Sequence, residues 1–146
     1  MEYDDFSLSE NFERMASEYY KALNSKGFVF MRFDDLQNEK LKLLTKTIQQ
    51  LAYFEAMLTS LKRYQSKKIF DLKKLTEFQK NDLSKMYNIT LPKTKQNLDF
   101  PSLENIISFE AKIIKSYFEL LELEDDNAKH ITIKNMLSSR LDILAN

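Results

Sequence analysis

The chain has 146 residues with 22 basic and 22 acidic side chains, so its formal net charge is zero. This balance argues against a nucleic-acid-binding domain, which is usually strongly basic. The absence of cysteine excludes disulfides, thiolate zinc sites and cysteine nucleophiles.

A single glycine and two prolines indicate helices, because β-hairpins and phosphate-binding loops both need glycine-rich turns. The length predicts one domain over residues 1–146, and 43% hydrophobic residues are enough to form a core. No apolar run approaches the ~20 residues of a spanning helix, and the N-terminal segment is acidic, unlike a secretory signal. We therefore expect a soluble, cytoplasmic protein.

The first helix is expected to start at the capping box SLSE, residues 7–10. The apolar residues that follow share one helix face: Leu8, Phe12, Met15, Tyr19 and Leu23. Gly27 predicts the end of this helix. The next segment, FVFMRF at 28–33, leaves three alternatives open: a strand, a connector packed into the core, or the first turns of the next helix.

Residues 34–88 contain neither glycine nor proline, and we expect two antiparallel helices with a break near Gln65–Lys68. Asp34 or Asp35 is a candidate N-cap. One helix of fifty residues would be ~75 Å long and would need a partner chain, as in a homodimer, to cover its apolar stripe. The stripe consists of Leu41, Leu44, Ile48, Leu51, Phe54, Leu58 and Leu61, and continues more weakly through Leu72, Leu75, Leu83 and Met86.

The segment ITLPKTKQNLDFP, which holds both prolines, predicts a long loop. Ser102 should cap the next helix, and EDDN at 124–127 predicts a break before the last one. The inward-facing residues are expected to be Leu103, Ile106, Ile107, Ile113, Ile114, Tyr117, Leu120, Leu121, Ile131, Ile133, Met136, Leu137, Leu141 and Leu144. The sequence thus predicts an all-α antiparallel bundle of four or five helices with a crossover loop at about 89–101.

A short internal sequence repeat contains the main candidate metal ligands. LAYFEAMLTSL (51–61) and IISFEAKIIKS (106–116) share Phe-Glu-Ala, which places Glu55 and Glu110 beside the apolar stripes. In antiparallel partner helices the facing positions lie near 77–80 and 141, where Glu77 and Asp142 occur. A repeated helix pair with inward glutamates resembles the ferritin-like proteins, and the resemblance implies a metal site built from these four carboxylates.

The chain departs from the ferritin-like pattern at the two Glu-x-x-His motifs, because Lys80 follows Glu77 and the last helix contains SSRLD. Four carboxylates without histidine would favour hard cations over iron. Without a metal, the buried carboxylates should pair with neighbouring side chains, for which Lys62, Tyr117 and Arg140 are candidates.

His130, the only histidine, lies near a predicted helix start and is expected to be a surface or capping residue. A general base needs a partner at hydrogen-bond distance, and no serine lies in the glycine-flanked context of a nucleophile elbow. We therefore expect no enzyme activity and no cofactor.

The segment 61–88 carries eight basic residues against three acidic ones, with Tyr64, Phe70 and Phe78 interleaved. Such aromatics can stack on bases. Together with the long apolar stripes, the segment is also similar to a BAR-type module, which implies contact with an anionic lipid surface. The basic residues lie around most of the helix circumference, which favours an ordinary solvated face over either function.

Aromatic residues with methionine and arginine are typical of interface centres. Such a group occurs at Tyr19, Tyr20, Phe28, Phe30, Met31 and Arg32, although filling the groove of the bundle itself is the simpler role. We therefore expect a non-enzymatic cytoplasmic protein that works through protein–protein contact, as an adaptor, chaperone, inhibitor or immunity-type partner. A metal-binding ferritin-like bundle is the alternative, and a lipid-surface binder is the third.

Overall fold

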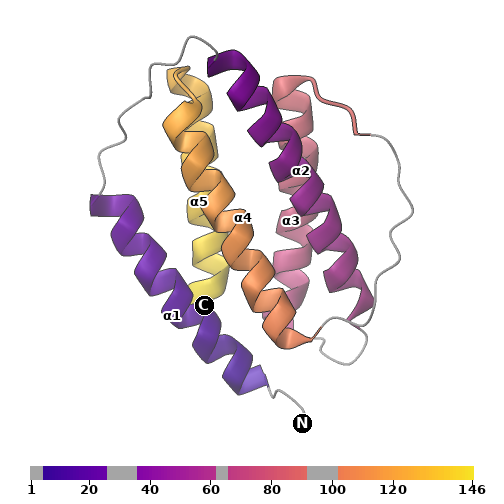
Figure 1. The fold of residues 1–146 in the computed structure, drawn as a ribbon. Coiled ribbons are helices and arrows are strands. Elements are labelled where there is room, and N and C mark those ends of the chain that lie inside the picture. Colours follow the sequence, from indigo (N-terminus) through magenta and orange to yellow (C-terminus); the bar gives the residue numbers. More distant parts are fainter. Residues whose placement is uncertain (1–4, 26–35, 62–65, 92–101) are drawn as a thin grey trace.

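The computed structural model describes residues 5–25, 36–61, 66–91 and 102–146. Within these ranges the chain forms α1 (Asp5–Ser25), α2 (Leu36–Ser60), α3 (Lys67–Tyr87), α4 (Leu103–Leu123) and α5 (Asn127–Ala145), with no strand among the described residues (Figure 1). The predicted all-α fold is confirmed. No helix in these ranges is both long enough and apolar enough to cross a membrane.

Four helices form a closed ring in which each packs against two others: α2 and α5 each contact both α3 and α4. Neighbours around the ring are antiparallel, since α2 and α5 run downwards in Figure 1 whereas α3 and α4 run upwards. A long crossover between α3 and α4 follows from this arrangement, because consecutive helices that run in the same direction must be joined from end to end. The predicted crossover lies there, although its residues 92–101 are outside the described ranges.

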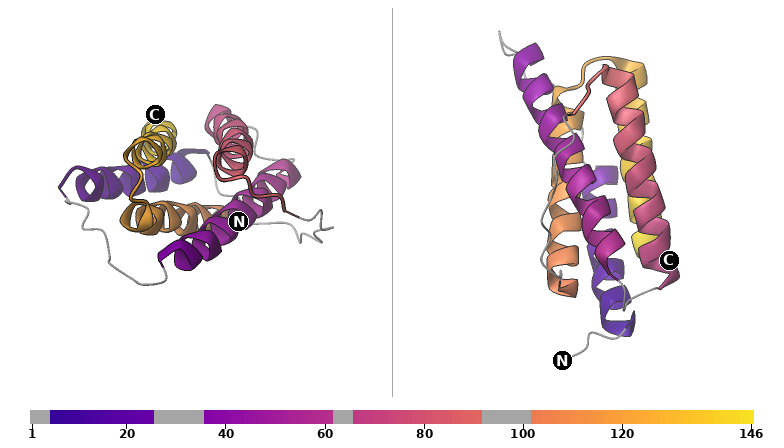
Figure 2. Two further views of the ribbon diagram at one scale, coloured as in Figure 1. Left: turned by 90° about the horizontal axis from the view of Figure 1, so that it is seen from above. Right: turned by 90° about the vertical axis from the view of Figure 1, so that its right-hand side faces the viewer.

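Helix α1 lies outside the ring, where it packs against α5 and less extensively against α4 (Figures 1 and 2). Its buried side chains are Leu8, Phe12, Ala16 and Leu23, and three of these belong to the predicted apolar face. The predicted capping box does not mark the start of α1, because the helix begins at Asp5 and residues 7–10 lie inside it. The segment 28–33 and both candidate caps of the second helix, Asp34 and Asp35, lie outside the described residues.

The remaining helix boundaries follow the local capping chemistry. Ser66 caps α3 by accepting a hydrogen bond from the Ile69 backbone N–H at 3.2 Å, which confirms two helices rather than one long rod. Ser102 caps α4 as predicted, through the N–H of Asn105 at 3.1 Å. The break predicted at 124–127 is also confirmed, since α4 ends at Leu123 and Asp126 caps α5.

The core contains the predicted inward residues with two clear exceptions: Leu41 is 52% exposed and Ile131 is 50% exposed. Ile131 precedes the buried Ile133 by two positions, and residues at that spacing cannot share a helix face. Leu41 lies three residues before the buried Leu44 and seven before the buried Ile48, on the same side of α2, but it is exposed in the second turn of the helix. Leu75, Met86 and Ile107 are half-buried at the edge of the core.

The two leucines near the start of α2 provide a test of this packing, because the sequence predicted both to be inside. Leu44→Ala removes a buried side chain that is 2% exposed and should lower the free energy of unfolding by about 2–5 kcal/mol. Leu41→Ala should change it by less than about 0.5 kcal/mol. Urea unfolding followed by circular dichroism measures both values, and equal losses would contradict the orientation of α2.

Candidate functional site

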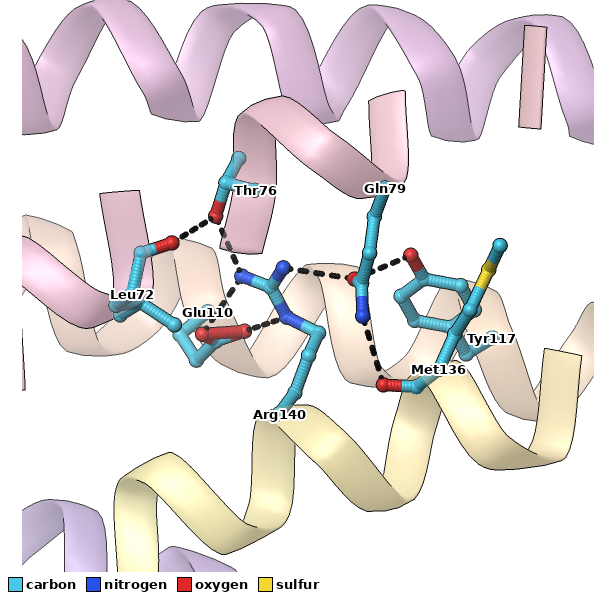
Figure 3. Close-up of polar contacts among 7 residues, drawn as sticks. All are labelled: Leu72, Thr76, Gln79, Glu110, Tyr117, Met136 and Arg140. Carbon is cyan, nitrogen blue, oxygen red and sulfur yellow. Dashed lines mark hydrogen bonds and ion pairs between the residues drawn. The ribbon is translucent and has the colours of Figure 1, made fainter. Parts of the chain in front are cut away.

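A buried ion pair lies at the centre of the ring, between α4 and α5 (Figure 3). Arg140 and Glu110 are both fully buried, and the guanidinium holds the carboxylate with two hydrogen bonds. Arg140 Nε donates to Glu110 Oε1 at 2.7 Å, and Nη2 donates to Oε2 at 2.9 Å. This bidentate geometry is the strongest arrangement that these two side chains can form.

Helix α3 supplies the other partners of Arg140. Nη1 donates to Gln79 Oε1 at 3.0 Å, and Nη2 donates to Thr76 Oγ1 at 3.2 Å. The Tyr117 hydroxyl also donates to Gln79 Oε1, at 2.7 Å, and the amide of Gln79 donates to the backbone oxygen of Met136 at 2.8 Å. Each polar side chain in this network therefore has a partner, as burial in a low-dielectric core requires.

The chemistry of the buried network is structural rather than reactive. Burial raises the pKa of the Tyr117 hydroxyl above its usual value, so the phenol remains protonated and acts as a donor. Arg140, Glu110, Thr76, Gln79 and Tyr117 are buried and hydrogen-bonded to one another or to the backbone, and they present no open face to a ligand. The network instead fixes how α3, α4 and α5 are positioned against one another.

Thr76 and Gln79 were not identified from the sequence, yet the sequence contains a signal for them. They occupy two positions of the buried row of α3: Ile69, Leu72, Thr76, Gln79 and Leu83. The apolar stripe of this segment looked weak because these two positions are polar. A polar residue within an otherwise apolar helical row indicates a buried partner, and here the partner is Arg140.

The four carboxylates proposed as a metal site are not brought together. Glu110 pairs with Arg140, and Glu55 pairs with Lys80 at 2.6 Å, whereas Glu77 and Asp142 are exposed. Among the described residues, no three histidine, aspartate or glutamate side chains are grouped so as to hold a metal ion.

The expected register was nevertheless close, because positions 80 and 140 do face the two glutamates. Cations stand there instead of carboxylates. Glu77 and Asp142 are turned away, since residues one or two positions from a buried one point elsewhere on a helix. Arg140 was among the side chains expected to pair with the glutamates, whereas Lys62 lies outside the described ranges.

The repeated Phe-Glu-Ala segment has a structural role. Phe54 and Phe109 stack where α2 meets α4, with ring centroids 5.6 Å apart and planes within 13° of parallel. The glutamate after each phenylalanine reaches a cation on the next helix in the chain, Lys80 for α2–α3 and Arg140 for α4–α5. The Arg140 guanidinium lies 5.8 Å from the Phe54 ring, so the two copies meet at the buried network.

A second polar cluster holds the turn between α4 and α5. Glu124 is fully buried and accepts hydrogen bonds from the Tyr87 hydroxyl, from Lys40 Nζ at 3.1 Å and from the Asp126 backbone N–H at 3.0 Å. Burial, together with the bond to Glu124, raises the pKa of Tyr87. His130, half-buried in the first turn of α5, donates its backbone N–H to the Asp126 carbonyl at 2.8 Å.

The tyrosines predicted to bind a partner are engaged within the molecule. The Tyr19 ring packs against the ring of Phe118 on α4, with the two centroids 5.9 Å apart. The Tyr20 hydroxyl donates a hydrogen bond to the Asp142 carboxylate on α5. Both contacts attach α1 to the ring, which is the alternative role considered for them. The other four predicted residues, Phe28, Phe30, Met31 and Arg32, lie outside the described part of the chain.

The outer face of α3 carries exposed aromatic residues. Phe70 is 53% exposed and Phe78 is 63% exposed. They belong to a row of exposed residues spaced by three or four positions, which we call the α3 stripe: Lys67, Phe70, Lys74, Phe78, Asn81 and Lys85. Lys74 Nζ lies 4.5 Å from the centroid of the Phe70 ring.

The basic residues of α3 are thus divided between two environments. Lys80 turns to Glu55, and Lys68 donates to the Leu144 carbonyl at 3.0 Å, where burial lowers its pKa. The three lysines of the α3 stripe form no ion pair with a carboxylate of the described residues. The expectation of an evenly solvated basic helix therefore holds only in part.

Comparison of the chain with models of protein families, with curated proteins and with solved structures found no match. The function must therefore be argued from the structure and the sequence.

The buried ion pair predicts a large cost for removing one partner alone. Arg140→Met leaves the buried carboxyl of Glu110 without its cation, and should lower the free energy of unfolding by about 3–5 kcal/mol. The double substitution Arg140→Met with Glu110→Leu should recover much of this loss, because two apolar side chains replace the two charges. Chemical denaturation of the wild type, of Arg140→Met, of Glu110→Leu and of the double variant measures the coupling energy between the two side chains.

The matched control is Lys80→Met, which breaks the half-exposed Lys80–Glu55 pair and should cost no more than about 1 kcal/mol. A loss at Arg140 as small as the loss at Lys80 would contradict the central role of the buried pair.

The contact between Tyr20 and Asp142 predicts a weakening of the fold at alkaline pH. Burial and the hydrogen bond raise the pKa of Tyr20 to about 12, whereas an unfolded tyrosine titrates near 10. The protonated Tyr20 hydroxyl contributes fully to the free energy of unfolding below about pH 10, and this contribution is lost as the pH rises towards about 12. The free energy of unfolding of Tyr20→Phe should therefore fall less steeply than that of the wild type over this range.

Ultraviolet titration of the phenolate checks the same contact directly. Asp142→Asn removes the charge but keeps the phenol, and should move the Tyr20 transition to lower pH. Identical titration curves for the wild type and Asp142→Asn would show that the contact does not form in solution.

Proposed function

We propose that this chain is a non-enzymatic protein that works by contact with another protein, and that the outer face of α3 is the contact surface. One observation carries the proposal: Phe70 and Phe78 are the most exposed large apolar side chains of the described residues. Exposed aromatic side chains gathered in one helical row are typical of the anchors of a protein interface.

The energetics support this surface. Fully burying an exposed phenylalanine side chain contributes roughly 1.5–3 kcal/mol, and covering the 53% and 63% of Phe70 and Phe78 that are exposed contributes a little over half of this for each. Two such residues on a rigid helix can therefore anchor a complex without an ordering cost in the backbone. The other exposed large apolar residues do not form such a row, since Leu41 and Tyr53 are twelve positions apart on α2 and Ile131 lies on α5.

The classes of protein that fit this mode of action are adaptors, chaperones, inhibitors and immunity-type partners, all of which act by surface recognition. A cytoplasmic location belongs to the same proposal. The buried network supports the proposed contact surface indirectly, because Arg140 and its partners hold α3 in a fixed position relative to α4 and α5. A rigid scaffold is what a pre-organised binding face requires.

The test compares two double variants in a capture experiment from an extract of the source cells. Phe70→Gln with Phe78→Gln removes both aromatic anchors, whereas Leu41→Gln with Ile131→Gln removes two residues of similar exposure elsewhere. Glutamine is at least as good a helix former as the residues it replaces. We expect at least one protein to be retained by the wild type and the control but reduced about tenfold or more by the α3 variant.

Each variant must first show the unfolding midpoint of the wild type, so that a loss of binding is not a loss of folding. Equal recovery of every captured protein by both double variants would contradict the proposal.

A further inference from the structure

The spacing of the α3 stripe suits a second helix. From Lys67 to Lys85 the stripe extends over about 27 Å at 1.5 Å per residue, with Phe70 and Phe78 about 12 Å apart within it. Its members follow one another at three- or four-residue intervals, the spacing with which one helix meets another. The stripe is therefore a straight row in which lysine and phenylalanine alternate from Lys67 to Phe78, followed by Asn81 and Lys85.

The charges of the stripe require acidic groups on whatever covers it. Elsewhere in the described ranges, Lys40 pairs with Glu124, Lys80 with Glu55 and Arg140 with Glu110. Lys67, Lys74 and Lys85 have no such carboxylate partner in those ranges. A partner that covers Phe70 and Phe78 also removes water from the neighbouring ammonium groups, and on a protein the carboxylates of acidic side chains compensate that loss best.

A hollow beside Phe70 adds a feature of shape. It lies between the end of α2 and the beginning of α3, has a volume of about 590 Å³, and is lined by Leu58, Thr59, Lys67, Ile69, Phe70 and Lys73. Its lining is apolar at Leu58, Ile69 and Phe70, where it fits an apolar side chain, and polar at Thr59, Lys67 and Lys73, where the two lysines can meet an adjacent carboxylate. Such a pocket is the usual setting for an interface anchor.

We propose that the α3 stripe binds an acidic amphipathic helix of another protein, whose apolar row covers Phe70 and Phe78 and whose carboxylates meet Lys67, Lys74 and Lys85. This inference rests on the proposed function and specifies the chemistry of the partner. With Lys73 of the hollow the surface carries four lysines, the lower limit of a typical basic cluster for anionic lipid, so a lipid surface is an outcome of the test below. The neutral net charge disfavours nucleic acid.

The first arm of the test reverses the charge of the stripe in the full chain. Lys67→Glu, Lys74→Glu and Lys85→Glu are combined, and the matched control combines three exposed lysines of other helices: Lys46→Glu, Lys115→Glu and Lys134→Glu. Recovery of the protein whose capture depends on Phe70 and Phe78 should fall about tenfold or more with the first set and change less than about twofold with the control. Equal effects of the two sets would overturn the inference.

The second arm uses defined probes and the ¹⁵N-labelled wild-type chain in nuclear magnetic resonance titrations. One synthetic peptide of about 18 residues has a leucine row flanked by glutamates, and a second peptide has lysines in place of the glutamates. The acidic peptide should shift the amide signals of residues 67–85, at concentrations about tenfold below any effect of the basic peptide. The shifts should weaken as salt rises from about 50 mM to about 500 mM.

Four results overturn the inference: no shift with the acidic peptide, equal shifts with both peptides, shifts produced only by vesicles of anionic phospholipid, or shifts that follow the concentration of the chain itself. The third result points to a lipid surface, and the fourth to a second copy of the chain.

The failure of the inference can be told apart from that of the proposed function. If the capture of a protein depends on the phenylalanines but not on the lysines, the result supports the proposed function and contradicts an acidic helix as the partner. The absence of any protein whose capture depends on the phenylalanines removes the proposed function itself.

Discussion

The pairing of Arg140 with Glu110 in the middle of the ring is the interaction on which the rest of the structure depends. Transferring either charge alone from water to the core is strongly unfavourable, and the pair is tolerated only because its hydrogen bonds are nearly complete. Gln79 and Thr76 of α3 and the helix that carries Tyr117 must therefore lie where they do. A rotation of one helix would leave a buried polar group without a partner, which is a larger penalty than the loss of apolar contacts alone.

The same logic explains why the inward glutamates do not form a four-carboxylate cluster. Each lies opposite a basic side chain of the adjacent antiparallel helix, so a cation that belongs to the chain neutralises it. The pair on α2 and α3 is partly exposed, whereas the pair on α4 and α5 is fully buried and has additional donors and acceptors. The repeated Phe-Glu-Ala segment thus forms the same kind of ion pair twice, once partly exposed and once buried. The stacked rings of Phe54 and Phe109 connect the α2–α3 pair to the α4–α5 pair.

The contrast between the interior and the outer face of α3 carries the functional argument. Inside, every member of the Arg140 network has a partner within the chain. Outside, the same helix presents two phenylalanines and three lysines to solvent. The interior fixes the orientation of α3, and the orientation of α3 places the stripe on the surface. The proposed contact surface and the buried network therefore lie on opposite faces of one helix.

The sequence by itself determined the helices, most of their breaks and much of their pairing. Scarce glycine and proline, the caps at Ser66, Ser102 and Asp126, and apolar spacing are local features, and local chemistry decides them. The register of the antiparallel pairs was also predictable, since positions near 80 and 140 do face Glu55 and Glu110.

Only the tertiary structure decided which neighbouring side chain at each of those positions turns inward. Successive residues differ by about 100° around a helix, so the orientation of each helix about its axis decides whether a cation or a carboxylate faces the neighbouring helix. That orientation is set by the simultaneous packing of several helices, so it turned Lys80 towards Glu55 and Arg140 into the core, and it left Glu77, Phe70 and Phe78 exposed.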